Sequence, residues 1–339
     1  MSNMYIMAAT ILLAALPEVA SPATAQNGAA WHLGAEYKLH GAGAVANLWL
    51  DASSRRLYVA HSDQVEVLNA DSGRSEGSMP AHDAAGIVVV DNTSRGFFAN
   101  RGSDAVTVFN PATLAAIRTV PLQAKNPESL VFDSDAQRIF VIAPGSGEVI
   151  ALNPHSGEIE GRIALKGHLR QAVSDGMGSL FVAAQDLNLI HVVDTHSLKF
   201  LGDFPSGDAD GPVSLAIDPF GRRLFVACSG GKLAVIDTDI GFTFEELPIA
   251  AGDPDSFFTF SPQGKGGWKG ADFVAGDAGT LTLIQMNAFI RYSEGGNVSI
   301  PRGVRALAYD SKTHRIFLSV SAPHPEVLTL VPASSEVTQ

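Results

Sequence analysis

Hydrophobic and polar positions along this chain follow a pattern that repeats every 40 to 49 residues. Each repeat holds a short apolar segment ending in Asp, a polar turn, an aromatic-centred segment, a loop, and an alternating segment that ends in Asn or Asp. A repeat of this length indicates one supersecondary unit per period. The residues that close the first segment are Asp51, Asp91, Asp133, Asp175, Asp218, Ser261 and Asp310, at intervals of 40, 42, 42, 43, 43 and 49 residues.

The segments within each repeat predict β-strands. Short runs rich in β-branched and aromatic residues, such as 57–60 and 224–227, are typical of buried strands. Alternating segments such as 65–69 predict a third strand, and weaker segments such as 159–165 predict an outermost fourth strand. Four strands per repeat are typical of a propeller blade, so we expect an all-β fold, a seven-bladed β-propeller of four-stranded blades. The predicted units are about 45–84, 85–126, 127–168, 169–211, 212–253, 254–303, and 304–332 together with 31–44.

The last unit lacks its outermost strand at the C-terminal end. Residues Leu33 to Leu39 have the required pattern and stand just before the first unit. We therefore expect the N-terminal strand to complete the last blade and close the ring, burying Leu33, Tyr37 and Leu39, because an open ring would leave an unpaired strand edge.

The sixth unit departs from the repeat. Its closing residue is Ser261 rather than Asp, and 12 residues separate it from the aromatic Phe273. The additional residues, around Gly264 to Gly270, predict an extended loop on the face opposite the loops that usually bind ligands in propellers.

The first 25 residues resemble a secretory signal. An apolar stretch from Tyr5 to Leu16 is followed by Pro17 and by Ala23-Thr24-Ala25, the small-x-small pattern that signal peptidase recognises. Twelve apolar residues are too few to span a hydrocarbon core of about 30 Å as a helix. No later apolar segment reaches the roughly 18 residues that a membrane-spanning helix needs, so no membrane span is expected. We predict a signal peptide at 1–25, cleavage after Ala25, and a soluble periplasmic or secreted propeller at 26–339.

Charge and cysteine content exclude several classes of function. The formal net charge of −12 argues against binding a nucleic-acid backbone, which requires clustered Lys and Arg. Cys228 is the only cysteine, which excludes an intrachain disulfide, a CxxCH haem attachment and a multi-cysteine metal site. Because the sequence around Cys228 offers no basic neighbour to lower its pKa, we interpret it as unreactive.

The repeat residues resemble a known family. The segment Arg56 to Ser62 (RLYVAHS), continued by Val65 to Gly73 (VEVLNADSG), resembles the YVTN repeat of bacterial and archaeal propellers, and Arg223 to Cys228 (RLFVAC) is similar. The resemblance covers 31–332 and is greatest to the YncE-like exported propellers. It implies the blade architecture. Propellers of this shape include lactone hydrolases, large subunits of quinoprotein amine dehydrogenases, surface-layer proteins and periplasmic binding proteins, and none of their catalytic residues can be transferred here by motif.

The recurrent aspartates could be mistaken for a metal array. Because one stands in nearly every repeat at the start of a turn, we interpret them as turn-forming residues whose side chains bind the downstream backbone. The candidate site lies elsewhere, in the loops between the fourth strand of one blade and the first of the next, and between second and third strands. These loops surround the axial channel. The candidate ligand-binding residues are Arg101, Asn126, Glu128, His168, Arg170, Asp208, Asp255 and Arg302.

Such a mixture of side chains suits an anion, a sugar acid, a divalent cation or a partner protein. The leading hypothesis is a non-enzymatic binding or interaction protein that holds a small molecule or protein at this face, without a cofactor. One alternative is a metal-dependent, lactonase-type hydrolase in which Asn126, Glu128, Asp208 and Asp255 would hold Ca²⁺ or another divalent cation and activate water. A second alternative is a propeller subunit of a periplasmic redox complex. No GxSxG motif supports Ser/His/Asp catalysis.

Overall fold

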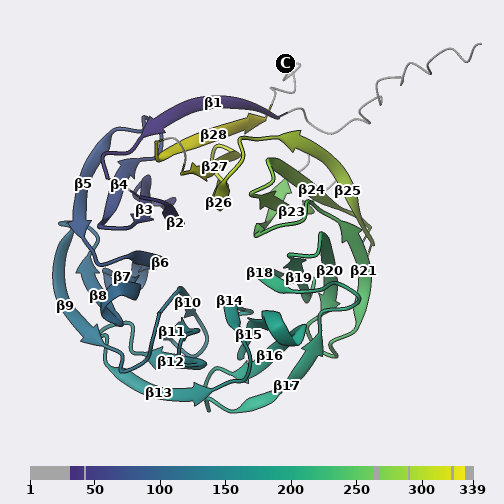
Figure 1. Ribbon diagram of the computed structural model, residues 1–339, viewed down its shortest axis with the longest axis horizontal. Helices are drawn as coiled ribbons and strands as arrows, with labels where there is room; N and C mark the ends of the chain where they lie inside the picture. The colour runs from purple at the N-terminus through teal and green to yellow at the C-terminus, as the bar shows by residue number, and fades with distance from the viewer. Residues whose placement is uncertain (1–30, 42, 263–267, 289–290, 322–323, 333–339) are drawn as a thin grey trace, which may run out of the picture.

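Seven four-stranded antiparallel sheets surround a central axis in the computed structural model (Figure 1). The structure describes residues 31–41, 43–262, 268–288, 291–321 and 324–332. The predicted signal at 1–25 lies outside these residues. The predicted fold class, a seven-bladed propeller of four-stranded blades, is confirmed. Within the described residues, no helix combines the length and the apolar character needed to cross a membrane.

Each blade is built from consecutive strands, except the last. Blades 1 to 3 comprise β2 (Val45–Asp51), β3 (Arg56–His61), β4 (Gln64–Asn69) and β5 (Ser75–Pro80); β6 (Ala84–Val90), β7 (Arg95–Asn100), β8 (Ala105–Asn110) and β9 (Ala115–Pro121); and β10 (Ser129–Asp133), β11 (Arg138–Ala143), β12 (Glu148–Leu152) and β13 (Ile159–Ala164). Blades 4 and 5 comprise β14 (Leu169–Ser174), β15 (Ser179–Ala184), β16 (Leu189–Asp194) and β17 (Phe200–Pro205); and β18 (Pro212–Asp218), β19 (Arg223–Cys228), β20 (Lys232–Asp237) and β21 (Thr243–Pro248). Blades 6 and 7 comprise β22 (Asp255–Pro262), β23 (Trp268–Gly276), β24 (Thr280–Ala288) and β25 (Arg291–Ser299); and β26 (Val304–Asp310), β27 (Arg315–Val320), β28 (Glu326–Pro332) and β1 (Trp31–Lys38). Short 3₁₀ turns occur at η1 (Asp91–Thr93), η2 (Arg101–Ser103) and η3 (Gln185–Leu187).

The N-terminal strand closes the ring, as predicted. Strand β1 pairs antiparallel with β28, from Trp31 opposite Pro332 to Lys38 opposite Glu326. The Tyr37 side chain is 3% exposed, and its hydroxyl donates a hydrogen bond of 2.9 Å to the carbonyl of Ala70 in blade 1. The expectation for Leu33 is wrong, because this side chain lies on the outer edge and is 50% exposed.

The turn aspartates have the structural role expected of them. Asp51 Oδ1 accepts a hydrogen bond of 2.9 Å from the backbone N–H of Ser53, and Asp218 Oδ1 accepts one of 2.8 Å from that of Gly221. Asn69 at the end of a third strand acts in the same way on Ser72, at 3.0 Å. Each side chain therefore satisfies backbone donors that the turn leaves unpaired.

Blade 6 corrects the interpretation of the long loop. Ser261 does not follow a strand but lies within β22, where it pairs with Lys269. Residues 268–270, predicted as loop, belong to β23, while 263–267 lie outside the described residues. The additional residues thus lengthen a hairpin, because each added pair on β22 is matched by one on β23.

Apolar clusters fill the spaces between neighbouring blades. One cluster joins Leu48 and Leu57 of blade 1 to Phe317 and Val327 of blade 7, and it is as fully buried as those between blades adjacent in sequence. Large buried aromatic side chains such as Phe140 stand at the centre of the second strands, as the aromatic pattern predicts. This packing holds the seven innermost strands in fixed positions around the axis.

Candidate ligand-binding channel

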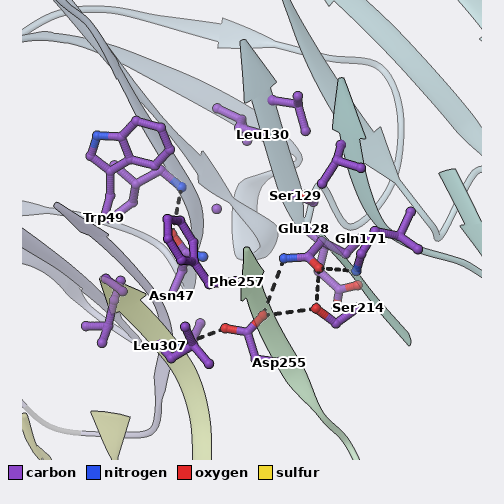
Figure 2. Close-up of a pocket in the computed structure, with 18 of the residues that line it drawn as sticks. Asn47, Trp49, Glu128, Ser129, Leu130, Gln171, Ser214, Asp255, Phe257 and Leu307 are labelled. Carbon is purple, nitrogen blue, oxygen red and sulfur yellow. Dashed lines mark hydrogen bonds between the residues drawn. The ribbon is translucent and has the colours of Figure 1, made fainter. Parts of the chain in front are cut away.

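A channel of about 750 Å³ runs along the propeller axis and is lined by the innermost strands β2, β6, β10, β14, β18, β22 and β26 (Figure 2). Each of these strands enters from the face formed by the loops between blades. Residues at the start of the strands, and in the loops before them, therefore form the mouth at that face. Residues at the ends of these strands lie near the opposite face.

Half of the predicted site residues line the channel. Arg101, Glu128, Arg170 and Asp255 do so. The other four, Asn126, His168, Asp208 and Arg302, are on loops outside the channel lining. The backbone N–H groups of Asn126 and His168 donate hydrogen bonds to Asp104 Oδ1 and Asp186 Oδ1, respectively. Asp208 borders a separate hollow of about 300 Å³ beside Glu246, and Arg302 is exposed.

One side of the mouth carries an arginine shared by two carboxylates. Arg101, in the turn between β7 and β8, places Nη2 2.9 Å from Asp83 Oδ1 and Nη1 3.7 Å from Glu128 Oε1. All three side chains are partly exposed, and Arg101 is 26% exposed. The pairing holds the guanidinium against the entrance of blades 2 and 3.

An ion pair crosses the mouth between blades that are not neighbours. Arg170, in β14 of blade 4, places Nη2 2.6 Å from Asp253 Oδ1 in the loop before blade 6. The pair spans the entrance of blade 5, where Val213 occupies the corresponding position on the channel wall. The distance is that of a charge-assisted hydrogen bond.

On blade 7, Arg305 lines the channel as a third arginine. Its side chain is exposed, and within the described residues its guanidinium makes no ion pair. We name Arg101, Glu128, Arg170, Asp253 and Arg305 the channel mouth.

Below the mouth, polar side chains join one blade to the next. Gln171 Oε1 accepts a hydrogen bond of 2.8 Å from the backbone N–H of Leu215 on blade 5. Ser214 Oγ accepts one of 2.9 Å from Ser256 on blade 6. Asn47 Oδ1 accepts a hydrogen bond of 3.3 Å from the backbone N–H of Ile87, and Asp255 Oδ2 accepts one of 2.9 Å from that of Leu307 (Figure 2). We name Asn47, Gln171, Ser214 and Asp255 the polar belt.

The belt changes the interpretation of Asp255. Its Oδ1 lies 3.2 Å from Ser214 Oγ and 3.4 Å from Gln171 Nε2, while Oδ2 accepts the Leu307 N–H. Burial raises the pKa of Asp255 to about 6, against hydrogen bonds that lower it. Because both carboxylate oxygens already accept hydrogen bonds from the protein, Asp255 is better explained as a link between blades 5, 6 and 7 than as a free ligand group.

Deeper in the channel the wall becomes apolar and aromatic. Trp49, Phe132, Phe257 and Tyr309 line it. The Phe257 side chain is 37% exposed although it lies inside the channel, and its ring centroid is 5.8 Å from that of Tyr309. The channel therefore offers charged groups at the mouth and an exposed aromatic surface below.

The acidic and amide side chains predicted to hold a cation do not gather at one point. In the part of the chain that the structure describes, no three His, Cys, Asp or Glu side chains are grouped so that they could hold a metal ion. Glu128 and Asp255 share the channel wall, whereas Asn126 and Asp208 are not part of it. Cys228 is fully buried, and burial raises the pKa of its thiol to about 12, in agreement with an unreactive side chain.

The opposite face of blade 5 carries exposed apolar side chains. Phe220, in the turn between β18 and β19, is 86% exposed, and Ile240, between β20 and β21, is 72% exposed. These residues lie at the ends of the strands remote from the channel mouth, so they provide an independent reference surface for binding experiments.

Comparison with known proteins identifies the fold but not the family. No protein-family model matches the chain, and no curated protein matches it in sequence. Two similar solved structures are described as "Structure of U3-55K" and "Crystal structure of RRP9 WD40 repeats". Each is 9% identical to this chain with a TM-score of 0.75, and the matches cover 89% of this chain and 98% and 97% of the respective structures. At this identity the likeness is one of fold, a seven-bladed propeller of the shape adopted by WD40 repeats.

Proposed function

We propose that this protein is an exported β-propeller of the YncE-like group that acts as a binding or interaction protein and holds its ligand or partner at the channel mouth. The observation that carries the proposal is the combination of a channel of about 750 Å³ with five charged side chains at one end. Its volume is typical of small-molecule sites, which are apolar cavities with a few placed polar groups.

The positions of these side chains also support binding at the mouth. Arg170 and Arg101 are fixed by ion pairs, so a ligand would meet preorganised donors and lose little of its affinity to ordering them. The small side chains of Ala46 and Ala85 leave the entrance of blades 1 and 2 open. The hydrolase alternative lacks comparable support, because the residues that it recruits do not converge.

A photo-crosslinking amino acid tests the location of the site. Placed at Ala46, which lines the mouth, it should form a covalent adduct with the native ligand or partner when cells that export the protein are irradiated. The matched control carries the same amino acid at Phe220 on the opposite face. Adducts at 220 with none at 46 would contradict the proposal.

Export is tested separately. The apolar stretch and Ala-Thr-Ala pattern support cleavage after Ala25, so N-terminal sequencing of the exported form should begin at Gln26. A protein that still begins at Met1 and remains in the cytoplasm would contradict it.

A further inference from the structure

The charges of the channel mouth do not cancel uniformly around the ring. Arg101 is shared by two carboxylates, Asp83 and Glu128, so that group carries one excess negative charge at neutral pH. Arg170 and Asp253 neutralise each other. Among the side chains of the mouth itself, Arg305, without an ion pair in the described residues, contributes one excess positive charge. The Asp255 carboxylate lies below the mouth, where both of its oxygens accept hydrogen bonds within the polar belt.

The two excess charges face each other across the channel. Glu128 immediately precedes β10, and Arg305 is the second residue of β26. These two strands lie on opposite sides of the axis, β26 just above the central opening in the view and β10 just below it (Figure 1). The mouth is therefore dipolar, with an acidic side at blades 2 and 3 and a basic side at blade 7.

On the basis of the function proposed above, we propose that the channel takes a short zwitterionic peptide, whose ammonium group pairs with Glu128 and whose carboxylate pairs with Arg305. Its apolar side chain then extends toward the exposed ring of Phe257. A ligand that carries only an anion would cover the acidic side of the mouth and leave its excess negative charge without a cation, because Arg101 can neutralise only one of its two carboxylates. A ligand that carries only a cation would leave Arg305 without an anion. An unpaired charge removed from water is costly.

The size of the channel favours a peptide over a single amino acid. A volume of about 750 Å³ lies in the range that suits drug-sized ligands. Two or three linked residues can place their terminal charges on opposite walls, whereas in a free amino acid both charges are attached to one carbon atom. Arginine is suited to the carboxylate end, since its planar guanidinium donates two parallel hydrogen bonds to a carboxylate.

Calorimetric titration with a panel of dipeptides tests this inference. The panel covers apolar, polar and charged first residues followed by Phe, each in four forms: free, N-acetylated, C-amidated and blocked at both ends. Free dipeptides should bind to a single site, and blocking either end should weaken binding by about tenfold or more, because each block removes a charge-assisted interaction.

Two variants assign the ends of the peptide. Glu128→Gln should bind free and N-acetylated peptides equally while still distinguishing the amides, and Arg305→Gln should show the reverse. The matched controls are Asp208→Asn and Arg302→Gln, which remove the same charges from loops of the same face outside the channel. They should retain both preferences.

The inference fails if no dipeptide binds, if doubly blocked peptides bind as well as free ones, or if both variants keep both preferences. A crosslinked adduct at Ala46 together with no dipeptide binding would leave the proposed function standing and reject only the peptide. The absence of both would reject the function as well.

Discussion

Asp272 stands at a position where other blades bury an apolar side chain. Leu57, Leu180 and Leu224 occupy the equivalent site at the start of the aromatic strand. The Asp272 side chain is 0% exposed, and among the residues that the structure describes its carboxyl oxygens have no hydrogen-bond partner beyond the adjacent backbone N–H of Phe273. Burial, and secondarily the charge of Asp255, raises the pKa of Asp272 to about 8.

Replacing Asp272 by Leu should stabilise the protein. The folded pKa lies above the ordinary value of 3.8, so unfolding releases a proton and the wild-type free energy of unfolding falls as the pH rises from about 4 to about 8. Asp272→Leu removes this loss and should gain about 1–3 kcal/mol near pH 8. Urea unfolding at about pH 5 and about pH 8 checks both effects. A less stable variant, or one that keeps the same pH dependence, would mean that the carboxyl group has a stabilising partner.

The sequence alone predicted some of the residues that line the channel and missed others. Arg101, Glu128 and Arg170 line the channel, and each comes from a segment that the repeat pattern assigns to the channel face. Arg302 was selected although Arg305 lines the wall. Arg305 stands five residues before Asp310, as Arg170 stands five before Asp175, so the repeat itself contained the signal that points to Arg305.

Other parts of the site depend on contacts between distant residues. Asp253 enters it through Arg170, 83 residues earlier, and the role of Asp255 becomes visible only from the Leu307 N–H of the next blade. Local patterns carry no information on either contact.

At the scale of elements, arginines at the start of the second strands connect neighbouring blades. Arg56 Nη1 donates to the carbonyl of Pro111 at 2.5 Å, and Arg138 Nη1 donates to that of Thr195 at 2.9 Å. Arg315 of blade 7 reaches the carbonyl of Ala70 in blade 1 at 3.5 Å. The closing junction therefore uses the same kind of contact as the junctions between consecutive blades.

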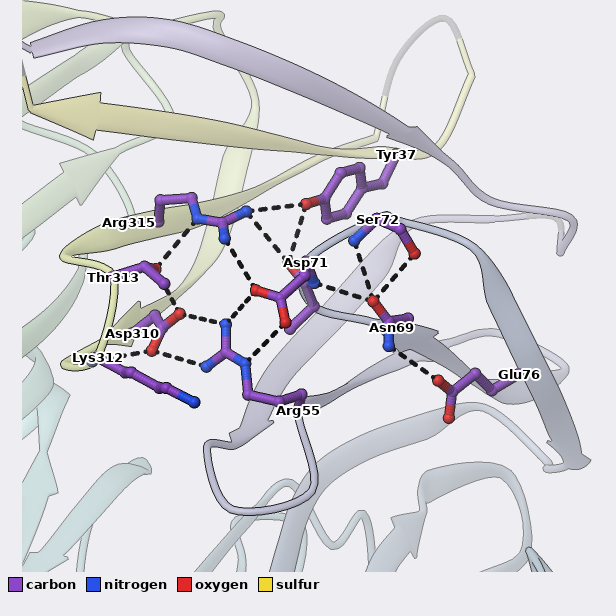
Figure 3. Close-up of polar contacts among 11 residues, drawn as sticks. Tyr37, Arg55, Asn69, Asp71, Ser72, Glu76, Asp310, Lys312, Thr313 and Arg315 are labelled. Atoms are coloured by element: carbon purple, nitrogen blue, oxygen red, sulfur yellow. Dashed lines mark hydrogen bonds and ion pairs between the residues drawn. The ribbon is translucent and has the colours of Figure 1, made fainter.

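The closing junction adds an ion-pair network that lies in the turns of blades 7 and 1 (Figure 3). Arg55 Nη2 lies 2.7 Å from Asp71 Oδ1 and 2.6 Å from Asp310 Oδ2, and the Asp310 side chain is 0% exposed. Burial raises the pKa of Asp310, but hydrogen bonds from Arg55 and Thr313 lower it further and hold it at about 2. The paired carboxylate thus stabilises the fold above about pH 4, and this contribution is lost as the pH falls through about 2.

Arg55→Ala should lower the free energy of unfolding by about 3–5 kcal/mol, because it leaves the buried Asp310 carboxylate unpaired. Arg222→Ala is the matched control: Arg222 has the equivalent position in blade 5, a similar backbone φ of 55° against 59°, and an ion pair with the exposed Asp239. It should cost about 1 kcal/mol or less. Equal losses in the two variants, measured by chemical denaturation, would contradict a special role for the closing junction.

Blade elements were predicted better than the exception in blade 6. Aromatic strands and Asn or Asp turns are specified by residues close together in sequence, so six units followed the pattern. In blade 6, β22 continues past the usual turn position because Pro262 pairs with Trp268, and this pairing depends on register rather than on composition.

For the whole molecule, the N-terminal strand decides whether the ring is closed. Deleting residues 26–40 removes β1, exposes the backbone edge of β28, and withdraws the buried Tyr37 ring. An unpaired edge promotes association, and loss of a buried aromatic side chain costs about 3–5 kcal/mol. Calorimetry and size exclusion should show a lower melting temperature and aggregation relative to a chain that begins at Gln26. A monomer that melts at the same temperature would mean that the ring closes in another way.

The binding site proposed here is the channel mouth, to which blades 2, 3, 4, 6 and 7 contribute charged side chains. The most direct measurement is a crystal structure of the protein with the tightest-binding dipeptide of the panel. We expect the peptide inside the channel, with its ammonium group at Glu128, its carboxylate at Arg305 and a side chain near Phe257. A peptide bound outside the channel, or on the face that carries Phe220, would contradict it.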